Sequence, residues 1–275
     1  MKPVPTAPVV RTVRLQQPLH WLALGWRDMG RCGWVSLAHG LVLTVFGQLL
    51  LLVAHQQFWL LAGAFSGMLV VGPVLATSLY ALSQAAERGE PLSWRLVPQT
   101  WLSWRRHGSH TDGKDWRLVR FGLLLGMAGT GWVLTSAALI TLLSPTPILQ
   151  PLDFLRHVVL ARENWLFEIW LALGGLLAAP IFASSAIAIP LLLDRRVSVL
   201  QAVVTSWETV LGNPAPMALW AALIMALTLL GLLTALLGLI VVMPLLGHAS
   251  WHAYRALVNA SAWPERTAPG TQGRA

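Results

Sequence analysis

The chain has 275 residues, of which 56% are hydrophobic and only 11% are charged, and its formal net charge is +8. Soluble domains carry about 25% charged residues, so this composition excludes an ordinary soluble fold and indicates a membrane protein. The basic excess does not indicate nucleic-acid binding, because the basic residues flank the apolar runs, where they orient a protein and meet anionic lipid. We therefore expect the lipid bilayer as a partner and no nucleic acid.

The chain begins with a polar, proline-rich segment, and we expect a disordered tail over residues 1–17. Residues 18–31 place Leu19, Leu22 and Trp26 at helical spacing. This pattern predicts a short amphipathic helix that lies at the membrane interface. The single cysteine of the chain excludes an internal disulfide.

The chain contains two long runs without charged residues. No Asp, Glu, Lys or Arg occurs between Arg31 and Glu87, or between Glu208 and Arg255. Because a span needs about 20 apolar residues, each run is long enough for two helices, and two single spans fit between the runs. We predict an all-α, polytopic helical bundle with six transmembrane helices, at about 34–54, 58–83, 119–143, 166–193, 215–234 and 237–257.

The basic residues also set the orientation of these spans. Only Arg156 and Arg162 lie on one side of the predicted membrane, and all other Lys and Arg residues lie on the opposite side. The positive-inside rule places the basic side in the cytoplasm. We therefore expect both termini in the cytoplasm, together with a second interfacial helix at 197–213 and a disordered tail at 259–275.

Helix packing and kinks are also indicated by the sequence. Small residues four apart occur as Gly63-xxx-Gly67 and Gly122-xxx-Gly126, a spacing that lets helices approach closely inside a bundle. Prolines inside the predicted spans are expected to kink them. They are Pro73, Pro180, Pro190 and Pro244.

Residues that could carry chemistry are few. The sequence holds no GxSxG, GxxxxGK[ST] or HExxH motif, so we expect no enzymatic activity. No charged residue lies deep within a predicted span, which argues against the proton relay of an ion-coupled transporter. His39, His248 and His252 lie near the cytoplasmic boundary, and the last two share a helix face. They could bind haem or a metal ion, or they could form hydrogen bonds to Ser, Thr or backbone groups. We predict no cofactor, with haem or a metal as the alternative.

Three runs of sequence are similar to a known family. They are VGPVLA at 71–76 with Tyr80 and ERGEP at 87–91, IPLLLDR at 189–195, and PLLGHASWHAYR at 244–255. With them the chain resembles, over about 18–258, the bacterial predicted integral membrane proteins known as domain of unknown function 2189. The resemblance implies a multi-pass protein of a bacterial inner membrane and supplies no activity.

These family-like runs end three predicted spans on the cytoplasmic side, so their polar and aromatic residues are candidates for one shared site. The candidate constellation is His39, Tyr80, Glu87, Arg88, Asp194, Arg195, His248, Trp251, His252 and Arg255. A set of this kind can carry function, or it can be a belt of interfacial aromatics and ion pairs that closes the bundle.

Three functions fit this sequence. The first is a non-enzymatic accessory, assembly or regulatory component of a membrane complex, with a membrane protein as partner. The second is a transporter or channel for a neutral or weakly polar solute, which kinked helices and two similar regions in a parallel repeat favour. The third is haem or metal handling by the histidines. A cytoplasmic cavity lined by His39, Tyr80, His248 and Arg255 would favour transport, and a solidly packed bundle would favour the first function.

Overall fold

The computed structural model describes residues 9–106, 117–161 and 165–266. Within this part of the chain the regular elements are helices, apart from one short antiparallel pair, β1 (Val9–Val10) and β2 (Val258–Asn259), and an isolated bridge between Arg195 and Glu265. The helices in chain order are α1 (Gln17–Cys32), α2 (Trp34–Ala54), α3 (Phe58–Leu75), α4 (Thr77–Glu87), α5 (Leu96–Arg106), α6 (Arg117–Leu143), α7 (Pro151–Phe154) continued by the π-helical turn η1 (Leu155–Val159), α8 (Leu166–Ser185), α9 (Ala188–Asp194), α10 (Val199–Gly212), α11 (Pro214–Leu233) and α12 (Leu239–Leu257).

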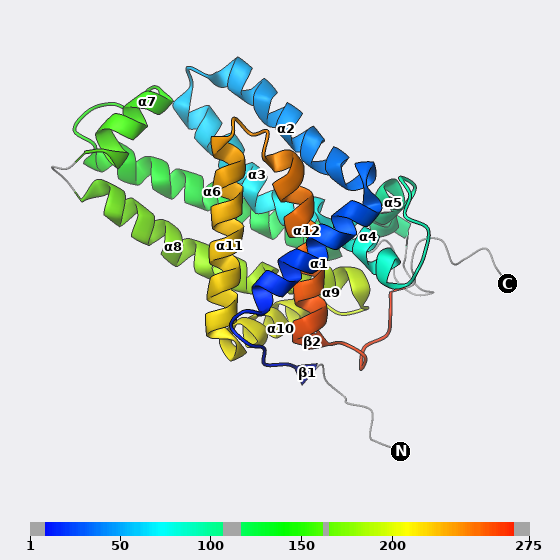
Figure 1. The fold of residues 1–275 in the computed structure, drawn as a ribbon. Coiled ribbons are helices and arrows are strands. Elements are labelled where there is room, and N and C mark those ends of the chain that lie inside the picture. The colour runs from blue at the N-terminus through cyan, green and yellow to red at the C-terminus, as the bar shows by residue number, and fades with distance from the viewer. Residues whose placement is uncertain (1–8, 107–116, 162–164, 267–275) are drawn as a thin grey trace. The chain divides into compact units, whose positions relative to one another are not determined.

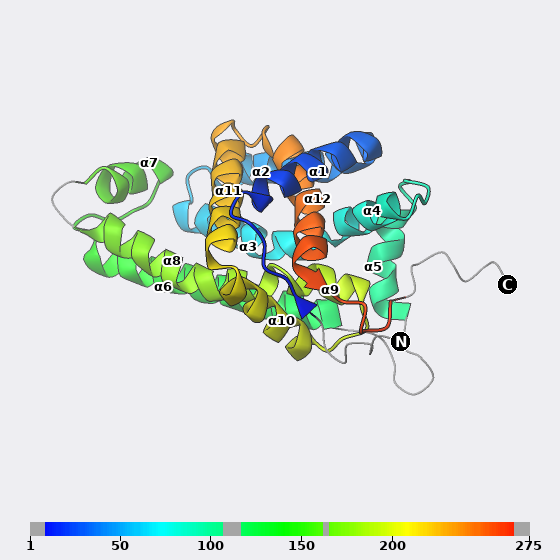
Figure 2. The ribbon, with the colours of Figure 1, turned by 60° about the horizontal axis from the view of Figure 1, so that its bottom comes forward.

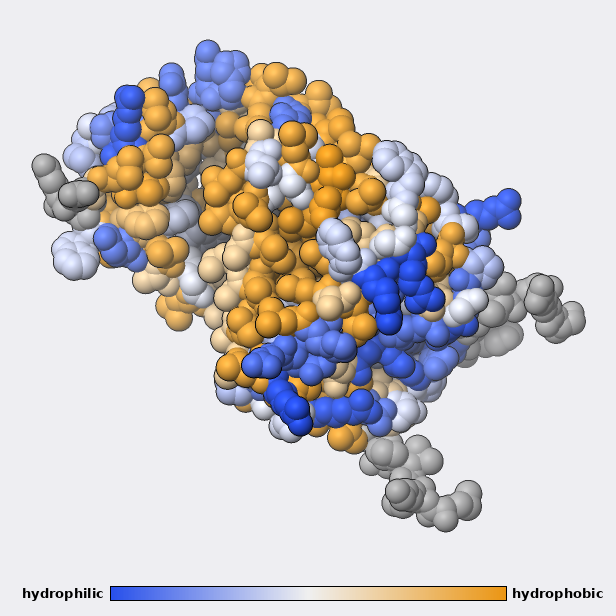
Figure 3. Space-filling model, viewed as in Figure 1, coloured by the Kyte–Doolittle hydropathy of each residue, from blue (hydrophilic) through white to orange (hydrophobic). Residues whose placement is uncertain are grey.

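Several described helices are suited to lipid. Four segments are long and apolar enough to cross a membrane: Trp34–Ala54, Arg117–Leu143, Leu166–Asp194 and Pro214–Leu233. On α11, the side chains of Met225, Leu229 and Leu233 are all more than half exposed, and apolar residues cover much of the face seen in Figure 3. A soluble protein does not expose apolar surface on this scale, so lipid is the solvent of these helices. The other two predicted spans, 58–83 and 237–257, coincide with shorter or less apolar helices.

The chain divides into two compact units. The first comprises Met1–Thr44, Pro73–Phe121 and Ala183–Ala275, and the second comprises Val45–Gly72 and Gly122–Phe182. In the first unit, α12 is the central helix, because α1, α4, α9 and α11 all pack against it (Figures 1 and 2). The large side chains of α12 on these faces, such as Trp251 and Tyr254, are fully buried.

Glycines allow α12 to approach its neighbours closely. A Cβ atom at Gly25 of α1 would lie 2.7 Å from the backbone nitrogen of Ala249 on α12. A Cβ at Gly40 of α2 would clash with the backbone of Ile240, which lies on α12. Backbone atoms cannot move aside as the end of a side chain can, so both crossings require glycine.

Two of the predicted spans are interrupted. The second predicted span breaks at Ala76, between α3 and α4, and the fourth breaks before Ala188, where α9 begins. Pro190 lies in the first turn of α9, where its missing N–H removes no helical hydrogen bond, whereas in the middle of a continuous helix it would. At this break the backbone N–H of Ile187 donates to the hydroxyl of Ser206 (3.1 Å), so this N–H has a hydrogen-bond partner although the helix is interrupted.

Both chain ends differ from the predicted disordered tails where the structure describes them. Strand β1 pairs with β2, which connects the segment before α1 to the end of α12. The backbone N–H of Val13 also donates to Asn213 Oδ1 (2.8 Å), and that of Arg266 donates to the carbonyl oxygen of Asp194 (2.9 Å). These backbone contacts order segments whose composition alone predicts disorder. Residues 1–8 and 267–275 of the predicted tails lie outside the described residues.

Candidate functional site

His248 lies at the centre of the first unit and joins three helices. Its Nε2 atom is 2.7 Å from the hydroxyl of Ser36 on α2, and its Nδ1 atom is 2.7 Å from the hydroxyl of Ser83 on α4. All three side chains are completely buried. A neutral imidazole donates through one nitrogen and accepts through the other, so the two serines satisfy both ring atoms.

His39 of α2 is held in a similar way, one helical turn further along the chain from Ser36. Its Nδ1 atom donates to the carbonyl oxygen of Val35 (2.8 Å), and its Nε2 atom lies 2.9 Å from the hydroxyl of Ser78 on α4. The indole of Trp94 stacks on the His39 ring, with 6.4 Å between ring centroids and 6° between planes. The ring is therefore fixed in position and in orientation.

His252 contacts carboxylates, whereas His39 and His248 contact hydroxyl groups. Its Nε2 atom donates to Oδ2 of Asp28 on α1 (2.7 Å), and its Nδ1 atom lies 3.8 Å from Glu87 Oε1 on α4. The Glu87 carboxylate also pairs with Arg255 at 3.3 Å. We call the histidine network the side chains of His39, His248 and His252 together with Asp28, Ser36, Ser78 and Ser83.

Asp28 is the buried acid of the histidine network. Burial by itself raises the pKa of its carboxyl group, but the hydrogen bond and charge of His252 outweigh burial. The pKa of Asp28 is therefore lower than usual, with smaller contributions from Ser83 and His248. Arg31 adds a partly exposed pair at 3.7 Å.

A second cluster gathers around Asp194, the last residue of α9. Its carboxylate accepts hydrogen bonds from Gln84 Nε2 on α4 (2.7 Å) and from the hydroxyl of Tyr254 on α12 (2.7 Å). It also accepts one from Nε of Arg195 (2.9 Å). Burial disfavours the charged guanidinium, but the Asp194 carboxylate outweighs it and holds the pKa of Arg195 above its usual range. The side chains of Gln84 on α4, Asp194 on α9 and Tyr254 on α12 therefore meet.

The segment after α12 adds a more exposed layer to the Asp194 cluster. The carboxylate of Glu265 lies 3.3 Å from Arg195 and 3.3 Å from Arg88, and Arg195 also donates to the carbonyl oxygen of Trp263 (3.0 Å). The Glu265 side chain is 60% exposed, so water screens these pairs.

Two aromatic members of the predicted constellation are core residues, and the Tyr80 hydroxyl has a side-chain hydrogen bond with Ser250. Tyr80 and Trp251 are buried, and the ring of Trp251 lies 5.4 Å from that of Tyr254. Within the described residues, the indole N–H of Trp251 has no hydrogen-bond partner. Both side chains belong to the core of the first unit.

Sequence reasoning missed several members of the two clusters. They are Asp28, Ser36, Ser78, Ser83, Gln84, Tyr254 and Glu265. For Asp28 the sequence did contain a signal. Trp21, Gly25 and Asp28 are spaced so that they share one face of a helix, and this face of α1 is buried. The sequence analysis instead used the helical spacing of a set that includes Leu19 and Trp26, and both of these side chains are more than half exposed.

The histidines do not assemble a metal site in the described part of the chain, where no group of three or more His, Cys, Asp or Glu could hold an ion. Both ring nitrogens of His39 and of His248 already contact protein oxygens. Their hydrogen bonds to serine and to a backbone carbonyl are the structural alternative that the sequence left open.

Ser83 and His248 have the separation expected of a nucleophile and its general base. Neither side chain is exposed at all, so no substrate can reach the hydroxyl. The arrangement therefore joins α4 to α12 rather than presenting a reactive group to solvent.

Comparison with known proteins identifies part of the chain. Residues 60–194 match the family described as predicted integral membrane protein (DUF2189). These residues belong to the DUF2189 family. Neither a curated protein nor a solved structure matches the chain.

The DUF2189 match confirms the family resemblance, but it covers residues 60–194 rather than about 18–258. It includes the segment between the runs at 71–91 and 189–195, and it ends at Asp194. The run at 244–255 lies outside it. The DUF2189 segment therefore supplies the α4 side of both clusters and the α9 side of the Asp194 cluster, and helices outside it supply Asp28 and His252.

Proposed function

We propose that this protein is a non-enzymatic accessory, assembly or regulatory component of a membrane complex. The observation that carries this proposal is the internal use of the candidate site. His248 contacts Ser36 and Ser83, and Asp194 accepts hydrogen bonds from Gln84 and Tyr254, all within one unit. Polar groups used in this way hold helices together, and they leave little free chemistry for a substrate.

A helical unit fixed by buried polar contacts suits a protein that presents a stable surface to a partner. The two amphipathic helices expose large apolar side chains, among them Trp26 on α1 and Leu200 and Leu211 on α10. Side chains of this kind fit the membrane interface or the apolar face of a membrane-protein partner. Exposed Arg27 and Arg31 on α1 add the charge that anionic lipid attracts.

The membrane arrangement we propose has six spans, with both termini in the cytoplasm of a bacterial cell and the protein in its inner membrane. Contacts between α2 and α12 support the pairing of these two helices as antiparallel spans. Ser36 near the start of α2 meets His248 in the second half of α12, and Thr44 donates to the carbonyl oxygen of Leu236, just before α12 begins (3.0 Å). The distribution of Lys and Arg supports the orientation.

A second candidate function is the transport of a neutral or weakly polar solute. The interruptions between α3 and α4 and between α8 and α9 favour it, because broken helices are common at transport sites. The second unit also contains a cavity lined largely by aromatic side chains.

The experiment that tests the proposal is purification of the tagged, full-length protein from native membranes in a mild detergent, followed by mass spectrometry. A partner must remain at constant stoichiometry after a high-salt wash, and an unrelated polytopic protein with the same tag must not retain it. Deleting either gene should then lower the amount of the other protein in the membrane.

A protein that purifies alone, and whose deletion changes the abundance of no other membrane protein, would contradict the accessory role. Solute flux into proteoliposomes made from that preparation would then support the second candidate. The two functions therefore predict different results from the same purified material.

A further inference from the structure

The second unit contains a cavity of about 170 Å³. Its walls come from α3, α6, α7 and α8, and every lining residue belongs to this unit. Neither the histidine network nor the Asp194 cluster contributes to it. A core cluster centred on Ile140, Ile148, Val158 and Leu166 packs beside the cavity.

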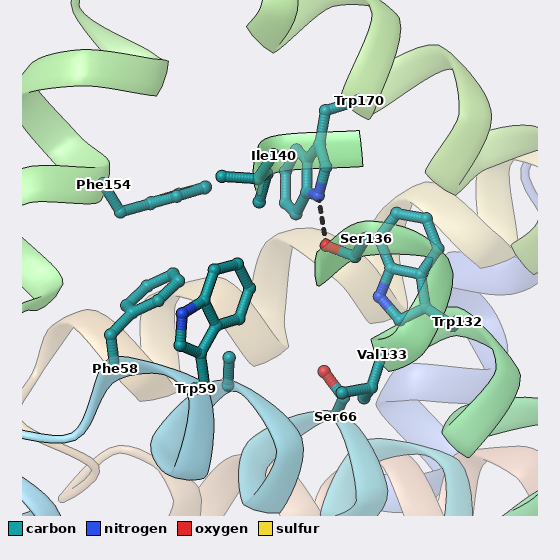
Figure 4. Close-up of a pocket in the computed structure, with 10 residues that line it drawn as sticks. Phe58, Trp59, Ser66, Trp132, Val133, Ser136, Ile140, Phe154 and Trp170 are labelled. Carbon is teal, nitrogen blue, oxygen red and sulfur yellow. Dashed lines mark hydrogen bonds between the residues drawn. The ribbon is translucent and has the colours of Figure 1, made fainter. Parts of the chain in front are cut away.

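Five of the ten residues that line the cavity are aromatic, and Figure 4 shows how their rings lie around it. Phe58 lies 4.9 Å from Trp59 in an edge-to-face arrangement and 5.2 Å from Phe154, measured between ring centroids. Trp170 lies 5.5 Å from Phe154 and 5.7 Å from Trp132. Rings in these orientations offer both faces and edges to a further ring, and each aromatic pair adds to the energy of apolar burial.

Two hydroxyl groups belong to the lining, in addition to the indole N–H groups of its tryptophans. Ser136 of α6 accepts a hydrogen bond from Nε1 of Trp170 (2.6 Å), which leaves its own hydroxyl proton for another acceptor. Ser66 of α3 lines the same cavity. No charged side chain is among the lining residues, so an ionised guest would lose its hydration without an opposite charge in return.

The size of the cavity limits the guest further. An apolar cavity of about 150 Å³ is large enough to bind benzene, so this cavity fits one aromatic ring with a small substituent. We propose that the cavity is a binding site for a neutral, single-ring aromatic molecule that carries one hydroxyl group. The ring packs among Trp59, Trp132 and Trp170, and the hydroxyl oxygen accepts from Ser136. This site is independent of the accessory role and would give the second candidate function a class of solute.

The test uses full-length protein in lipid nanodiscs, with 4-fluorophenol as the probe and fluorine NMR as the readout. Fluorobenzene is the matched probe without a hydroxyl, and empty nanodiscs measure partition into lipid. We expect a saturable, protein-dependent shift of the 4-fluorophenol resonance, with weaker binding of fluorobenzene. A shift that empty nanodiscs reproduce in full would overturn the proposal.

Two neighbouring residues of α6 provide a matched pair of variants. Val133→Phe fills the cavity and should abolish saturable binding, whereas Leu134→Phe, at a side chain that is 66% exposed, should leave it unchanged. Binding that survives Val133→Phe in protein that elutes like the wild type would contradict the site.

Ser136→Ala keeps the test decisive if Val133→Phe does not fold. It should weaken 4-fluorophenol binding about fivefold, the effect of one lost hydrogen bond, and leave fluorobenzene binding unchanged. Equal weakening of both probes would overturn the proposed role of the hydroxyl. A stoichiometric lipid that 4-fluorophenol cannot displace would assign the cavity to an acyl chain and overturn the proposal. None of these outcomes depends on capture of a partner, so failure here is distinct from failure of the accessory role.

Discussion

Asp28 and His252 are 224 residues apart in the chain, yet their Oδ2 and Nε2 atoms are 2.7 Å apart in the buried centre of the first unit. The contact joins α1, which lies outside the predicted spans, to the central helix α12. Because Gly25 brings the two backbones together one turn earlier, the pair and the crossing depend on each other. This relationship makes α1 part of the folded core rather than a helix that only rests on the membrane surface.

Replacing Asp28 with Asn should lower the free energy of unfolding by about 3 kcal/mol, because the change removes one partner of a buried charged pair. The measurement is an SDS-induced unfolding titration in mixed micelles. Glu208→Gln is the control, since Glu208 is an exposed acid on α10 and should change stability by less than about 0.5 kcal/mol. Equal effects of the two substitutions would show that the Asp28 contact contributes nothing specific.

The same acid predicts a pH dependence of stability. The pKa of Asp28 is lowered from a reference of 3.8, so the folded protein holds this carboxylate ionised at a pH where the unfolded chain protonates it. Its contribution is complete above about pH 4 and is lost as the pH falls through the lowered pKa. We expect the stability difference between wild type and Asp28→Asn to shrink as the pH is lowered from 5 towards 2. A difference that stays constant over this range would contradict the assigned shift.

His248 and its two serines should behave as one unit. His248→Ala leaves the buried hydroxyls of Ser36 and Ser83 without their partner, and we expect it to cost about 3 kcal/mol of unfolding free energy. Changing both serines to Ala in that background should cost little more, because no buried hydroxyl then remains unsatisfied. A mutant cycle measures the coupling, and additive effects of the three substitutions would argue against the network.

Gly25 and Gly30 test the packing of α1 with a matched pair of substitutions. Gly25→Ala places a methyl group 2.7 Å from the backbone nitrogen of Ala249 and should destabilise the protein by about 1–3 kcal/mol or prevent folding. At Gly30 nothing lies within 4 Å of the added atom, so Gly30→Ala should be neutral or stabilising by up to about 1 kcal/mol. Thermal unfolding in detergent compares the two, and a stable Gly25→Ala protein would contradict the close crossing.

The sequence predicted most helices of the structure because apolar runs and charge boundaries are local signals. The predicted span at 34–54 coincides with α2, and the break near Thr234 falls between α11 and α12. The breaks at Ala76 and before Ala188 could not be placed, because a proline in an apolar run is compatible with either a kink or a new helix. Which of these occurs depends on tertiary contacts such as the one between Ile187 and Ser206.

Close packing and buried partners were harder to predict from one sequence. Of the glycines in the GxxxG spacing, Gly63 faces a side-chain carbon of Val133 at an ordinary 3.8 Å from an added Cβ, and nothing lies within 4 Å at Gly67 and Gly126. The tight crossings use Gly25 and Gly40 instead. A glycine alone does not reveal which helix faces it. For the same reason the predicted constellation contained His252 without its partner Asp28.

Asp194 and Glu265 should differ sharply in their contribution to stability, although both are acids that contact Arg195. Asp194 is buried and accepts from Gln84 and Tyr254, so Asp194→Asn should cost about 2–3 kcal/mol of unfolding free energy. Glu265 is 60% exposed, and Glu265→Gln should cost less than about 1 kcal/mol. The same SDS titration measures both substitutions. A larger loss of stability for Glu265→Gln than for Asp194→Asn would contradict the prediction that the buried carboxylate contributes more.

The proposed topology predicts where reporter proteins fused to the chain will lie. Fusions after Gln57 and after Leu152 should report the outside of the inner membrane, and fusions after Gly108 and after Ala260 should report the cytoplasm. The fusion after Ala260 is the most discriminating, because its side depends on whether α11 and α12 both cross the membrane. Paired alkaline phosphatase and green fluorescent protein fusions give opposite signals on the two sides. An outside report after Ala260 would mean that α12, the helix carrying His248 and His252, does not cross the membrane as a sixth span.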